Sequence, residues 1–528
     1  MNNGNGWTTG WRERLWSDLD RRWDLIVVGG GITGAGILRE ASRAGFKTLL
    51  VEASDFASGT SSRSSKLVHG GLRYLSNLQI KLTLESVRER DRLLREGGGL
   101  IEPLENVIAS YQGDRPPAWV IGAALVVYDS LALRWRHKHH VPKEVKALCP
   151  SINLDHMAGG YSYFDAQTDD ARLVLRVIRE AVRAGGAALN YASVEGLLRD
   201  RSGRAHGIGL CDRLSGKQEE VHSPIVISAT GAWADQLRSH VDAKPRLRPL
   251  RGSHLFFPLD KLPLTRCIGF LHPADRRPVF AYPWEGVALV GTTDVDQGAD
   301  LPADPHVSAT EIEYLMHAVT HAFRPLNLGL KDVQSAMSGV RAVVDTGQAN
   351  PSKESREFVL WDENGLLTVT GGKLTTFRLM AQQALRAVRR RLPGHPRFSA
   401  AQRVLDPIEA VPETSLDPTV LVRLLGRYGA DAPALIAAAM PDELTPIGNT
   451  PSLWAELRWA ARAEGVVHLD DLLLRRVRLG IIAPGGALPL MDRIRSIAQP
   501  ELGWDDERWH SEEAAYASLW RRCYSVRP

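Results

Sequence analysis

Cysteine is scarce in this sequence, with four residues in 528, namely Cys149, Cys211, Cys267 and Cys523. They lie far apart, without the CxxC spacing of a zinc site or a dithiol redox motif, so no metal site of that kind is predicted. So few cysteines also exclude a disulfide framework, and free thiols are typical of a reducing compartment. Residues 1–23 mix tryptophans with charged side chains, unlike the apolar run of a secretory leader. We therefore expect a cytoplasmic protein.

The sequence also lacks a long hydrophobic run and a strong excess of one charge. A membrane-spanning helix needs about 20 apolar residues, whereas the most apolar stretch, residues 118–133, is shorter and contains Asp129. The 65 lysines and arginines face 61 acidic residues, and without a basic tail nothing indicates a nucleic-acid partner. A chain of this length with 44% hydrophobic residues is expected to form two or three globular units.

The clearest structural signal is a βαβ unit near the start of the chain. The apolar run Leu25–Val28 predicts a buried parallel strand that ends in three glycines at 29–31. A helix is expected over about 34–44, and residues 48–51 predict a second strand. The glycines therefore lie at a turn from strand to helix.

Gly29, Gly31 and Gly34 match the GxGxxG pattern of a dinucleotide-binding turn, and Glu52 lies twenty-one residues after the second of them. Glycines let backbone N–H groups approach a pyrophosphate at the positive end of a helix, and the carboxylate accepts hydrogen bonds from ribose hydroxyls. FAD and NAD both present adenosine diphosphate to such a unit, so the motif alone leaves the choice between them open.

The rest of the chain predicts an α/β protein with a discontinuous Rossmann-type domain. A further strand at 224–227 leads to another glycine turn at Gly231. Short β-like runs that alternate with turns over about 246–370 predict an inserted mixed β-sheet. We expect this sheet and the nucleotide-binding part to share one region over 24–400, followed by an α-helical C-terminal domain over 410–528.

The run GTSSRSSKLVHGGLRYL at residues 59–75 closely resembles the signature of FAD-dependent glycerol-3-phosphate dehydrogenases. Further motifs follow in the family's order across about residues 24–400: DDARL at 169–173, ATG at 229–231, GSH at 252–254, GTTD at 291–294, SGVR at 338–341 and GGKLTT at 371–376. Ala232 and Ala342 stand where the family often has proline, a difference that affects loop stiffness more than chemistry.

This resemblance implies a D-amino-acid-oxidase-like flavoprotein fold, noncovalently bound FAD, and oxidation of sn-glycerol 3-phosphate to dihydroxyacetone phosphate. It also implies peripheral attachment to the inner face of the cell membrane, with a quinone as electron acceptor. The oligomeric state stays open, a homo-oligomer included. By motif position, the expected FAD contacts come from the glycine turns, the ribose-binding acid and the serine-rich loop: Gly29, Gly31, Gly34, Glu52, Thr60, Ser61, Ser62, Ser65, Gly231, Gly371 and Gly372.

Oxidation of a secondary alcohol by a flavin requires hydride transfer to N5 and a base for the hydroxyl proton. His254 and His69 are the candidate bases, because imidazole titrates near neutrality and both lie in family motifs. We prefer His254, with a structural histidine at the start of a strand as the alternative interpretation. Lys373 follows a strand and two glycines, where helix N-terminal amides would stabilise reduced flavin and the lysine charge is available to the flavin or to the substrate.

A phosphate dianion needs several cations, preferably guanidinium groups that bond two oxygens together. Arg341 and Arg73 are expected phosphate ligands by motif placement, and Arg356 by a weaker local match. Tyr74 and Thr375 are expected as further substrate contacts.

The apolar stretch at 118–133 also predicts an interfacial helix. It is followed directly by RWRHKHH at 134–140, so an apolar segment adjoins a cationic, aromatic one, as in a membrane-surface anchor. A buried helix with a solvated basic end is the alternative. The family resemblance favours the anchor, because an enzyme that reduces a lipid-dissolved quinone must reach the bilayer surface.

Three other functions stay open. A glycerol-3-phosphate oxidase would share the fold and substrate site but pass electrons to oxygen. An amine or amino-acid oxidase would have less use for several phosphate-matching cations. A nucleotide-binding scaffold would keep the glycine turn and Glu52 while free to lose the distal site, and the retention of His254, Arg341 and Lys373 together argues against it.

Overall fold

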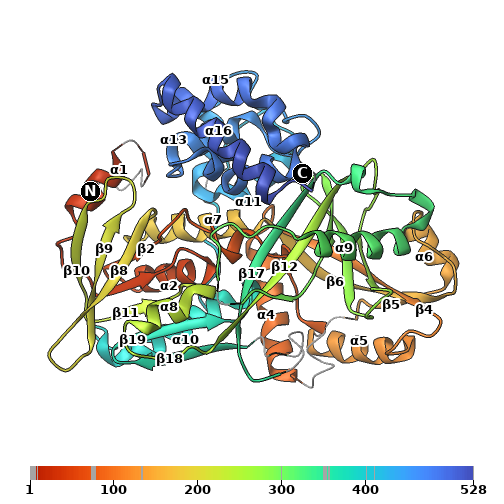
Figure 1. Ribbon diagram of the computed structural model, residues 1–528, viewed down its shortest axis with the longest axis horizontal. Coiled ribbons are helices and arrows are strands. Elements are labelled where there is room, and N and C mark those ends of the chain that lie inside the picture. The colour runs from red at the N-terminus through yellow and green to blue at the C-terminus, as the bar shows by residue number, and fades with distance from the viewer. Residues whose placement is uncertain are drawn as a thin grey trace.

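Two sheets and a helical C-terminal part dominate the computed structural model (Figure 1). The structure describes residues 7–8, 10–72, 79–132, 135–298, 300–348, 354, 357–399, 401–409 and 411–526.

The first sheet is the parallel sheet that the βαβ pattern predicts. Its six strands lie in the order β18-β19-β11-β1-β2-β7, and only the edge strand β18 runs antiparallel to its neighbour. In chain order their bounds are β1 (Leu25–Val28), β2 (Thr48–Val51), β7 (Ala187–Leu189), β11 (Val226–Ser228), β18 (Phe358–Glu363) and β19 (Leu366–Gly371). The strands come from distant segments, so the nucleotide-binding domain is discontinuous, as expected.

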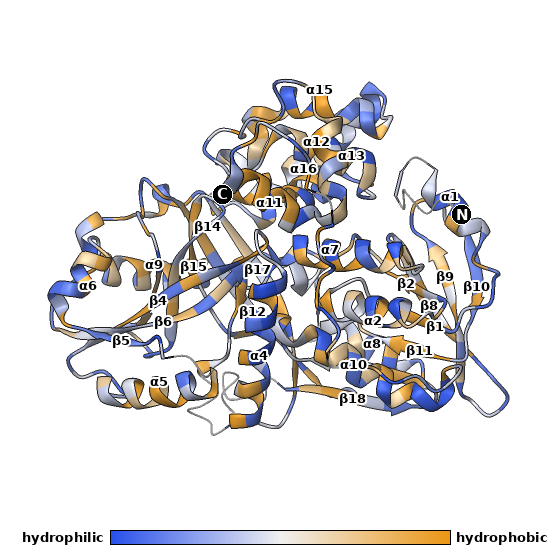
Figure 2. Cartoon of the chain, turned by 180° about the vertical axis from the view of Figure 1, so that it is seen from behind, coloured by the Kyte–Doolittle hydropathy of each residue, from blue (hydrophilic) through white to orange (hydrophobic). Residues whose placement is uncertain are grey.

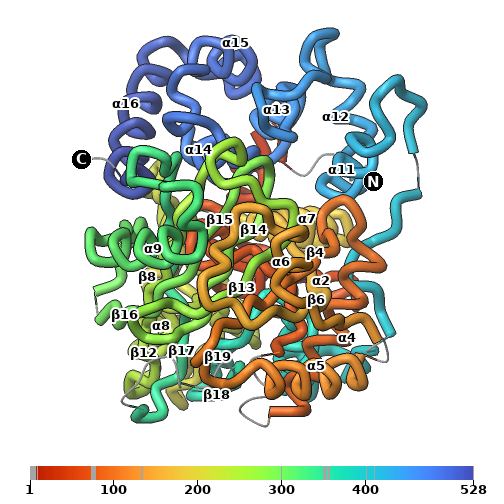
Figure 3. The backbone as a smooth tube through the Cα atoms, turned by 90° about the vertical axis from the view of Figure 1, so that its right-hand side faces the viewer, coloured from red at the N-terminus to blue at the C-terminus, as the bar shows by residue number. Residues whose placement is uncertain are grey.

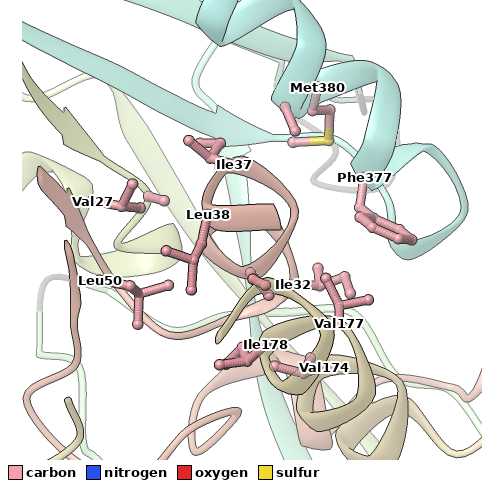
Figure 4. Close-up of a cluster of buried hydrophobic side chains, with 14 of the residues drawn as sticks. Val27, Ile32, Ile37, Leu38, Leu50, Val174, Val177, Ile178, Phe377 and Met380 are labelled. Carbon is pink, nitrogen blue, oxygen red and sulfur yellow. The ribbon is translucent and has the colours of Figure 1, made fainter. Parts of the chain in front are cut away.

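Three helices cover one face of this sheet: α2 (Ile32–Arg43), α7 (Asp170–Arg183) and α10 (Phe377–Val388). Figure 4 shows Val27 and Leu50 of the sheet, Leu38 of α2, Val174 of α7 and Phe377 of α10 in one buried cluster. Every second residue of β1 and β2 points to these helices, which is the alternation a strand buried on both faces requires.

The opposite face is covered by a three-stranded antiparallel sheet and the N-terminal segment. The small sheet contains β8 (Ala192–Arg199), β9 (Ala205–Asp212) and β10 (Gln218–His222), and α1 (Trp11–Ser17) lies nearby. Trp16 and Trp23 are buried in this layer, while Trp7 stacks on Phe56 with ring centroids 5.0 Å apart. The tryptophan-rich extension therefore belongs to the core of the domain.

The second sheet is larger and mixed. It follows the order β16-β12-β15-β14-β13-β4-β6-β3, with β17 beside β12 and β5 beside β6. In chain order the bounds are β3 (Leu67–Val68), β4 (Ile101–Tyr111), β5 (Lys138–His140), β6 (Met157–Thr168), β12 (Leu247–Pro258), β13 (Cys267–Leu271), β14 (Pro278–Trp284), β15 (Val287–Gly291), β16 (Val295–Asp296) and β17 (Ser335–Val344). α6 (Pro142–Leu148) and α9 (Ala309–Ala322) flank it.

The expected extent of this inserted sheet, about 246–370, needs correction at both ends. The sheet also contains β3 to β6, from residues before 170, whereas β18 and β19 pair into the first sheet through β11. Strand pairing is a long-range property, and a short β-like run carries no local sign of the sheet it joins.

Two helices lie at the lower edge in Figure 1, the second of them over the stretch at 118–133 that was predicted to be helical. They are α4 (Ile80–Glu96) and α5 (Ala118–Ala132). Within the described part of the chain, no helix combines the length and apolar character needed to cross a membrane.

The C-terminal part is helical, as predicted. Its main elements are α11 (Pro418–Tyr428), α12 (Ala432–Ala438), α13 (Trp454–Ala463), the π-helix η9 (Asp471–Arg476), α14 (Leu479–Ile482), α15 (Met491–Leu502) and α16 (Asp506–Cys523). Figure 3 shows it as a layer above β14 and β15. Apolar side chains of these helices share one core with Phe256, Trp284 and Met337 of the second sheet, so the helical part is anchored to the rest of the protein by a common core.

Buried ion pairs connect the C-terminal part to the first domain. Asp55, at 0% exposure, accepts from Arg475 at 2.5 Å and from Arg476 at 2.5 and 2.7 Å. Asp169, at the start of α7, pairs with Arg427 at 2.8 Å. Burial alone would raise the pKa of Asp55, but the charges of Arg476 and Arg475 outweigh it and lower that pKa to about 2.

We expect Asp55→Asn to destabilise the protein by about 3–5 kcal/mol at neutral pH, because it leaves buried guanidinium charge without its carboxylate. The folded pKa lies below the unfolded value of about 3.9, so the stabilisation by Asp55 is present above about pH 4 and is lost as the pH falls towards about 2. Chemical denaturation at several pH values measures both effects. Asp442→Asn is the control, because its ion pair with Arg493 is largely exposed and should contribute at most about 1 kcal/mol. Equal destabilisation by both variants would contradict the prediction.

Candidate functional site

A cavity of about 830 Å³ runs along the carboxyl ends of the parallel strands. Both predicted glycine turns, at 29–34 and 371–372, contribute to its wall, together with Glu52 and the loop at 58–61. In open parallel sheets this edge is where ligands bind. The sequence motifs therefore converge on one site.

The first glycine turn is shaped by close backbone approach. A Cβ atom at Gly34 would lie 1.9 Å from the carbonyl oxygen of Gly29, and Gly29 itself has a φ of 112°. No side chain other than hydrogen fits there. The turn thus exposes the backbone at the start of α2 to the cavity, which is the cradle a pyrophosphate requires.

Glu52, at the end of β2, holds this turn in place. Its carboxylate accepts from the backbone N–H of Gly30 at 2.7 Å and from that of Ser54 at 2.9 Å. Burial raises the pKa of Glu52, although these backbone hydrogen bonds act in the opposite direction. Glu52 lines the cavity beside the turn, in the position of a ribose-binding acid.

The serine-rich loop divides into residues on the cavity wall and residues behind it. Thr60 and Ser61 lie on the wall, and the Ser61 hydroxyl accepts from the first amide of α2, that of Ile32, at 2.9 Å. Ser62 and Ser65 are absent from the described wall. The carbonyl of Ser62 accepts from Lys66 at 2.9 Å and from Arg478 at 2.8 Å.

The second glycine turn repeats the strand-to-helix arrangement. Gly371 and Gly372 have φ values of 76° and 75° and lead from β19 through a 3-10 turn into α10. They line the cavity together with Gly231 and Lys373, whose Nζ donates to the Ser86 hydroxyl at 3.2 Å. One cavity therefore connects two turns that expose backbone amides.

Arg341 extends from β17 into the wall of the cavity. Its guanidinium lies over Gly252 of β12, where a Cβ would be 2.2 Å from Nη2, and it donates to the Thr292 hydroxyl at 2.9 Å and to Asp294 at 3.2 Å. The side chain is 21% exposed. Arg341 is thus fixed on one side and accessible from the cavity.

His254 lies two residues after Gly252 on β12 and is 1% exposed. Its Nε2 is 2.8 Å from the Ser65 hydroxyl, and no described residue offers a hydrogen-bond partner to Nδ1. Burial, with the charges of Arg341 and Lys66, lowers the pKa of His254 well below its usual range. The ring is neutral at physiological pH, and it lies behind the described wall of the cavity.

The remaining predicted site residues fall into two groups. Thr375 is 1% exposed, and its hydroxyl donates to the carbonyl of the half-buried His69 at 3.4 Å. Neither residue belongs to the described cavity wall. Arg73, Tyr74 and Arg356 lie outside the described residues.

The cavity wall also contains residues that sequence reasoning missed: Tyr191, Arg213, His468, Asp470 and Arg475. The last three belong to the C-terminal part. None of the five residues occurs in a motif, and only the tertiary arrangement brings them to the site. The adjacent arginines at 475 and 476 in a helical, apolar segment were the one local signal of a buried acidic partner.

Comparison with known proteins agrees with this geometry. A family model described as FAD dependent oxidoreductase matches residues 24–378, and one described as the C-terminal domain of alpha-glycerophosphate oxidase matches residues 378–509. The aerobic glycerol-3-phosphate dehydrogenase of Staphylococcus aureus strain MRSA252 is 32% identical over 495 residues, with 88% of each chain covered.

Solved structures show the same fold. A glycerol-3-phosphate dehydrogenase from Bacillus halodurans, complexed with FAD, aligns with a TM-score of 0.78 at 25% identity and 98% coverage of both chains. The FAD-bound L-alpha-glycerophosphate oxidase of Mycoplasma pneumoniae aligns with a TM-score of 0.58 at 18% identity, covering 72% of this chain and 97% of its own. The cofactor that fits the two glycine turns and Glu52 is therefore FAD, and the chain belongs to the family of FAD-dependent oxidoreductases that includes the aerobic glycerol-3-phosphate dehydrogenases.

Proposed function

We propose that this protein oxidises sn-glycerol 3-phosphate to dihydroxyacetone phosphate and passes the electrons to a membrane quinone. The observation that carries the proposal is the presence of two cations, Arg341 and Lys373, on the wall of the cavity that contains the second glycine turn. A phosphate dianion is bound best by such charges. The names of the related proteins supply the same substrate.

FAD, when bound, supplies the acceptor for the hydride that leaves C2 of the substrate. The protein's part is to bind and orient. Thr292 and Asp294 hold the fork of Arg341, so little side-chain freedom is lost when it binds phosphate oxygens. The backbone amides at the second glycine turn favour negative charge near them.

We propose that His254 accepts the hydroxyl proton through the hydroxyl of Ser65, the residue next to Ser64 on the cavity wall. The neutral ring at physiological pH and the 2.8 Å contact between Nε2 and the Ser65 hydroxyl support this route. His69, whose carbonyl is engaged by Thr375, is the second candidate.

The electron acceptor separates this proposal from its closest competitor. An oxidase would form hydrogen peroxide in air, whereas a quinone-linked dehydrogenase needs an added quinone or dye for turnover.

Structural neighbours also include a glycine oxidase at 20% identity and a TM-score of 0.51, which shows a shared fold only. Glycerol 3-phosphate and glycine are each added to the yellow protein without oxygen, and bleaching of the flavin reports which of them is the substrate. Bleaching by glycine and not by glycerol 3-phosphate would overturn the proposal.

Replacement of Arg341 by alanine should lower kcat/KM for glycerol 3-phosphate about 30- to 1000-fold, which corresponds to the loss of a charge-assisted contact worth about 2–4 kcal/mol. Bound FAD, measured by its absorbance, should stay at the wild-type level. Arg324→Ala is the matched control, because that arginine is 74% exposed and pairs with Asp155 at the surface. An unchanged kcat/KM in the Arg341 variant would remove this arginine from the substrate site.

Replacement of His254 by alanine should slow flavin reduction by glycerol 3-phosphate about 100-fold or more, because proton abstraction loses its acceptor. Stopped-flow bleaching measures this rate directly, and the flavin spectrum before mixing reports whether the site is intact. Wild-type bleaching in this variant would transfer the role to His69 or another group.

We further propose that α5 and the segment after it attach the protein to the membrane surface. Three apolar side chains of α5 are widely exposed, Trp119 at 71%, Val127 at 45% and Val126 at 42%, and Trp135 follows at 69%. Figure 2 shows α5 at the lower edge of the molecule, and most of its residues are hydrophobic. The exposed Arg136 and Lys138 next to it add positive charge; Arg134 lies outside the described residues.

Sedimentation with anionic liposomes tests this attachment. We expect binding that weakens with salt and is largely lost when Arg134, Arg136 and Lys138 are replaced by glutamate, with dye-linked activity retained. Lys217→Glu combined with Arg493→Glu is the control, because Lys217, just before β10, and Arg493 of α15 are exposed and lie away from α5. Equal loss in the control would indicate a general charge effect, and absence of binding in the wild type would exclude the attachment.

A further inference from the structure

The C-terminal helical part contributes directly to the wall of the cofactor cavity. His468, Asp470 and Arg475 line it, although they follow the first glycine turn by more than four hundred residues. The family's nucleotide motifs lie within the first domain and do not include them. We propose that His468 and Asp470 are binding residues for the adenosine half of FAD, so that the C-terminal part completes the cofactor site.

The end of the cavity that these residues reach is defined by Glu52. The segment after β2 and the segment after β7 lie side by side there: Ala192 N–H donates to the Glu52 carbonyl at 2.8 Å, and Tyr191 N–H donates to the Ser54 carbonyl at 2.8 Å. A carboxylate at the end of the second strand of such a sheet binds ribose. This end of the cavity is therefore the adenosine end.

Three contacts fix the C-terminal segment at this end. The His468 ring meets the Tyr191 ring edge-on, with centroids 5.0 Å apart. The Tyr191 hydroxyl donates to Asp471 at 2.7 Å. Arg475 donates to Asp55, three residues after Glu52, at 2.5 Å. Because a ring contact, a hydrogen bond and an ion pair act together, the segment is tied to both sides of the adenosine end.

The two proposed binding side chains are themselves oriented by neighbours. His468 Nδ1 is 2.9 Å from Glu512 of α16, and this hydrogen bond raises the pKa of His468. Asp470 accepts from Arg475 at 2.7 Å. The remaining ring nitrogen of His468 accepts from the adenine amino group when the ring is neutral and donates to an adenine or ribose acceptor when the ring is protonated. The Asp470 carboxylate can accept from the adenine amino group or a ribose hydroxyl.

Nucleotide titration of the FAD-free full-length protein tests this assignment. FAD binding is followed by quenching of its fluorescence, and ADP, which contains only the adenosine diphosphate half, is measured by competition with FAD. We expect the Kd values for both ligands to rise about tenfold in His468→Ala and in Asp470→Ala. The controls His510→Ala and Asp492→Ala replace exposed residues of the same part of the chain and should bind as the wild type does.

The melting temperature of the FAD-free protein separates binding from folding. The contacts of His468 with Tyr191 and Glu512, and of Asp470 with Arg475, also stabilise the protein without ligand. A binding role is therefore read from the rise in melting temperature on adding FAD or ADP, which should be smaller than in the wild type. If either alanine variant melts earlier, Asp470→Asn, which keeps the size of the side chain, decides: it must still weaken ADP binding. Wild-type Kd values for FAD and ADP in His468→Ala and Asp470→Ala, or in Asp470→Asn, would overturn the proposal.

Discussion

The pairing of Asp55 with Arg475 and Arg476 is the interaction on which the form of the cavity depends. Taking a carboxylate and two guanidinium groups out of water is costly, and the cost is offset only while all three stay together in good geometry. Asp55 also follows Glu52 within the same short segment, so this ion pair lies close to the ribose-binding acid. A contact between domains therefore borders the nucleotide site of one of them.

A second group of buried charges extends the same principle to the serine-rich loop. Lys66 pairs with Asp170 at 2.9 Å, and burial lowers the pKa of this lysine to about 8. Arg478 donates to the Ser62 carbonyl from the other side. The serine-rich loop is thus held by Lys66, a cation of its own, and by Arg478 from the C-terminal part. Preorganised polar groups of this kind reduce the reorganisation that binding requires.

Local sequence patterns predicted the parts of the site that depend on local physics. The turn at 29–34 was predictable because only glycine tolerates a Cβ position 1.9 Å from a carbonyl oxygen, and the strand and helix around it have distinct periods. Arg341 and Lys373 were found through family motifs and do lie on the cavity wall.

Residues that depend on long-range packing could not be predicted in this way. The sheet that β18 and β19 join is set by the pairing of β19 with β11. His468 reaches the adenosine end only because buried ion pairs dock its domain there. His254 lies well inside β12 and not at the start of a strand, and its ring fits there because Gly291 of β15 faces it, where a Cβ would lie 2.2 Å from the ring. Which glycine faces which side chain becomes known only when the pairing of the strands is known.

The separation of Asp55 from Arg476 along the chain has a consequence for biosynthesis. The glycine turn and Glu52 leave the ribosome more than four hundred residues before the cations that neutralise the neighbouring Asp55. Until they emerge, the nascent nucleotide-binding segment carries a carboxylate that cannot be buried. Domains usually fold in the order of their synthesis. Here the ion pair of Asp55 can form only after more than four hundred further residues have been translated, so the segment after Glu52 takes its final form late in synthesis.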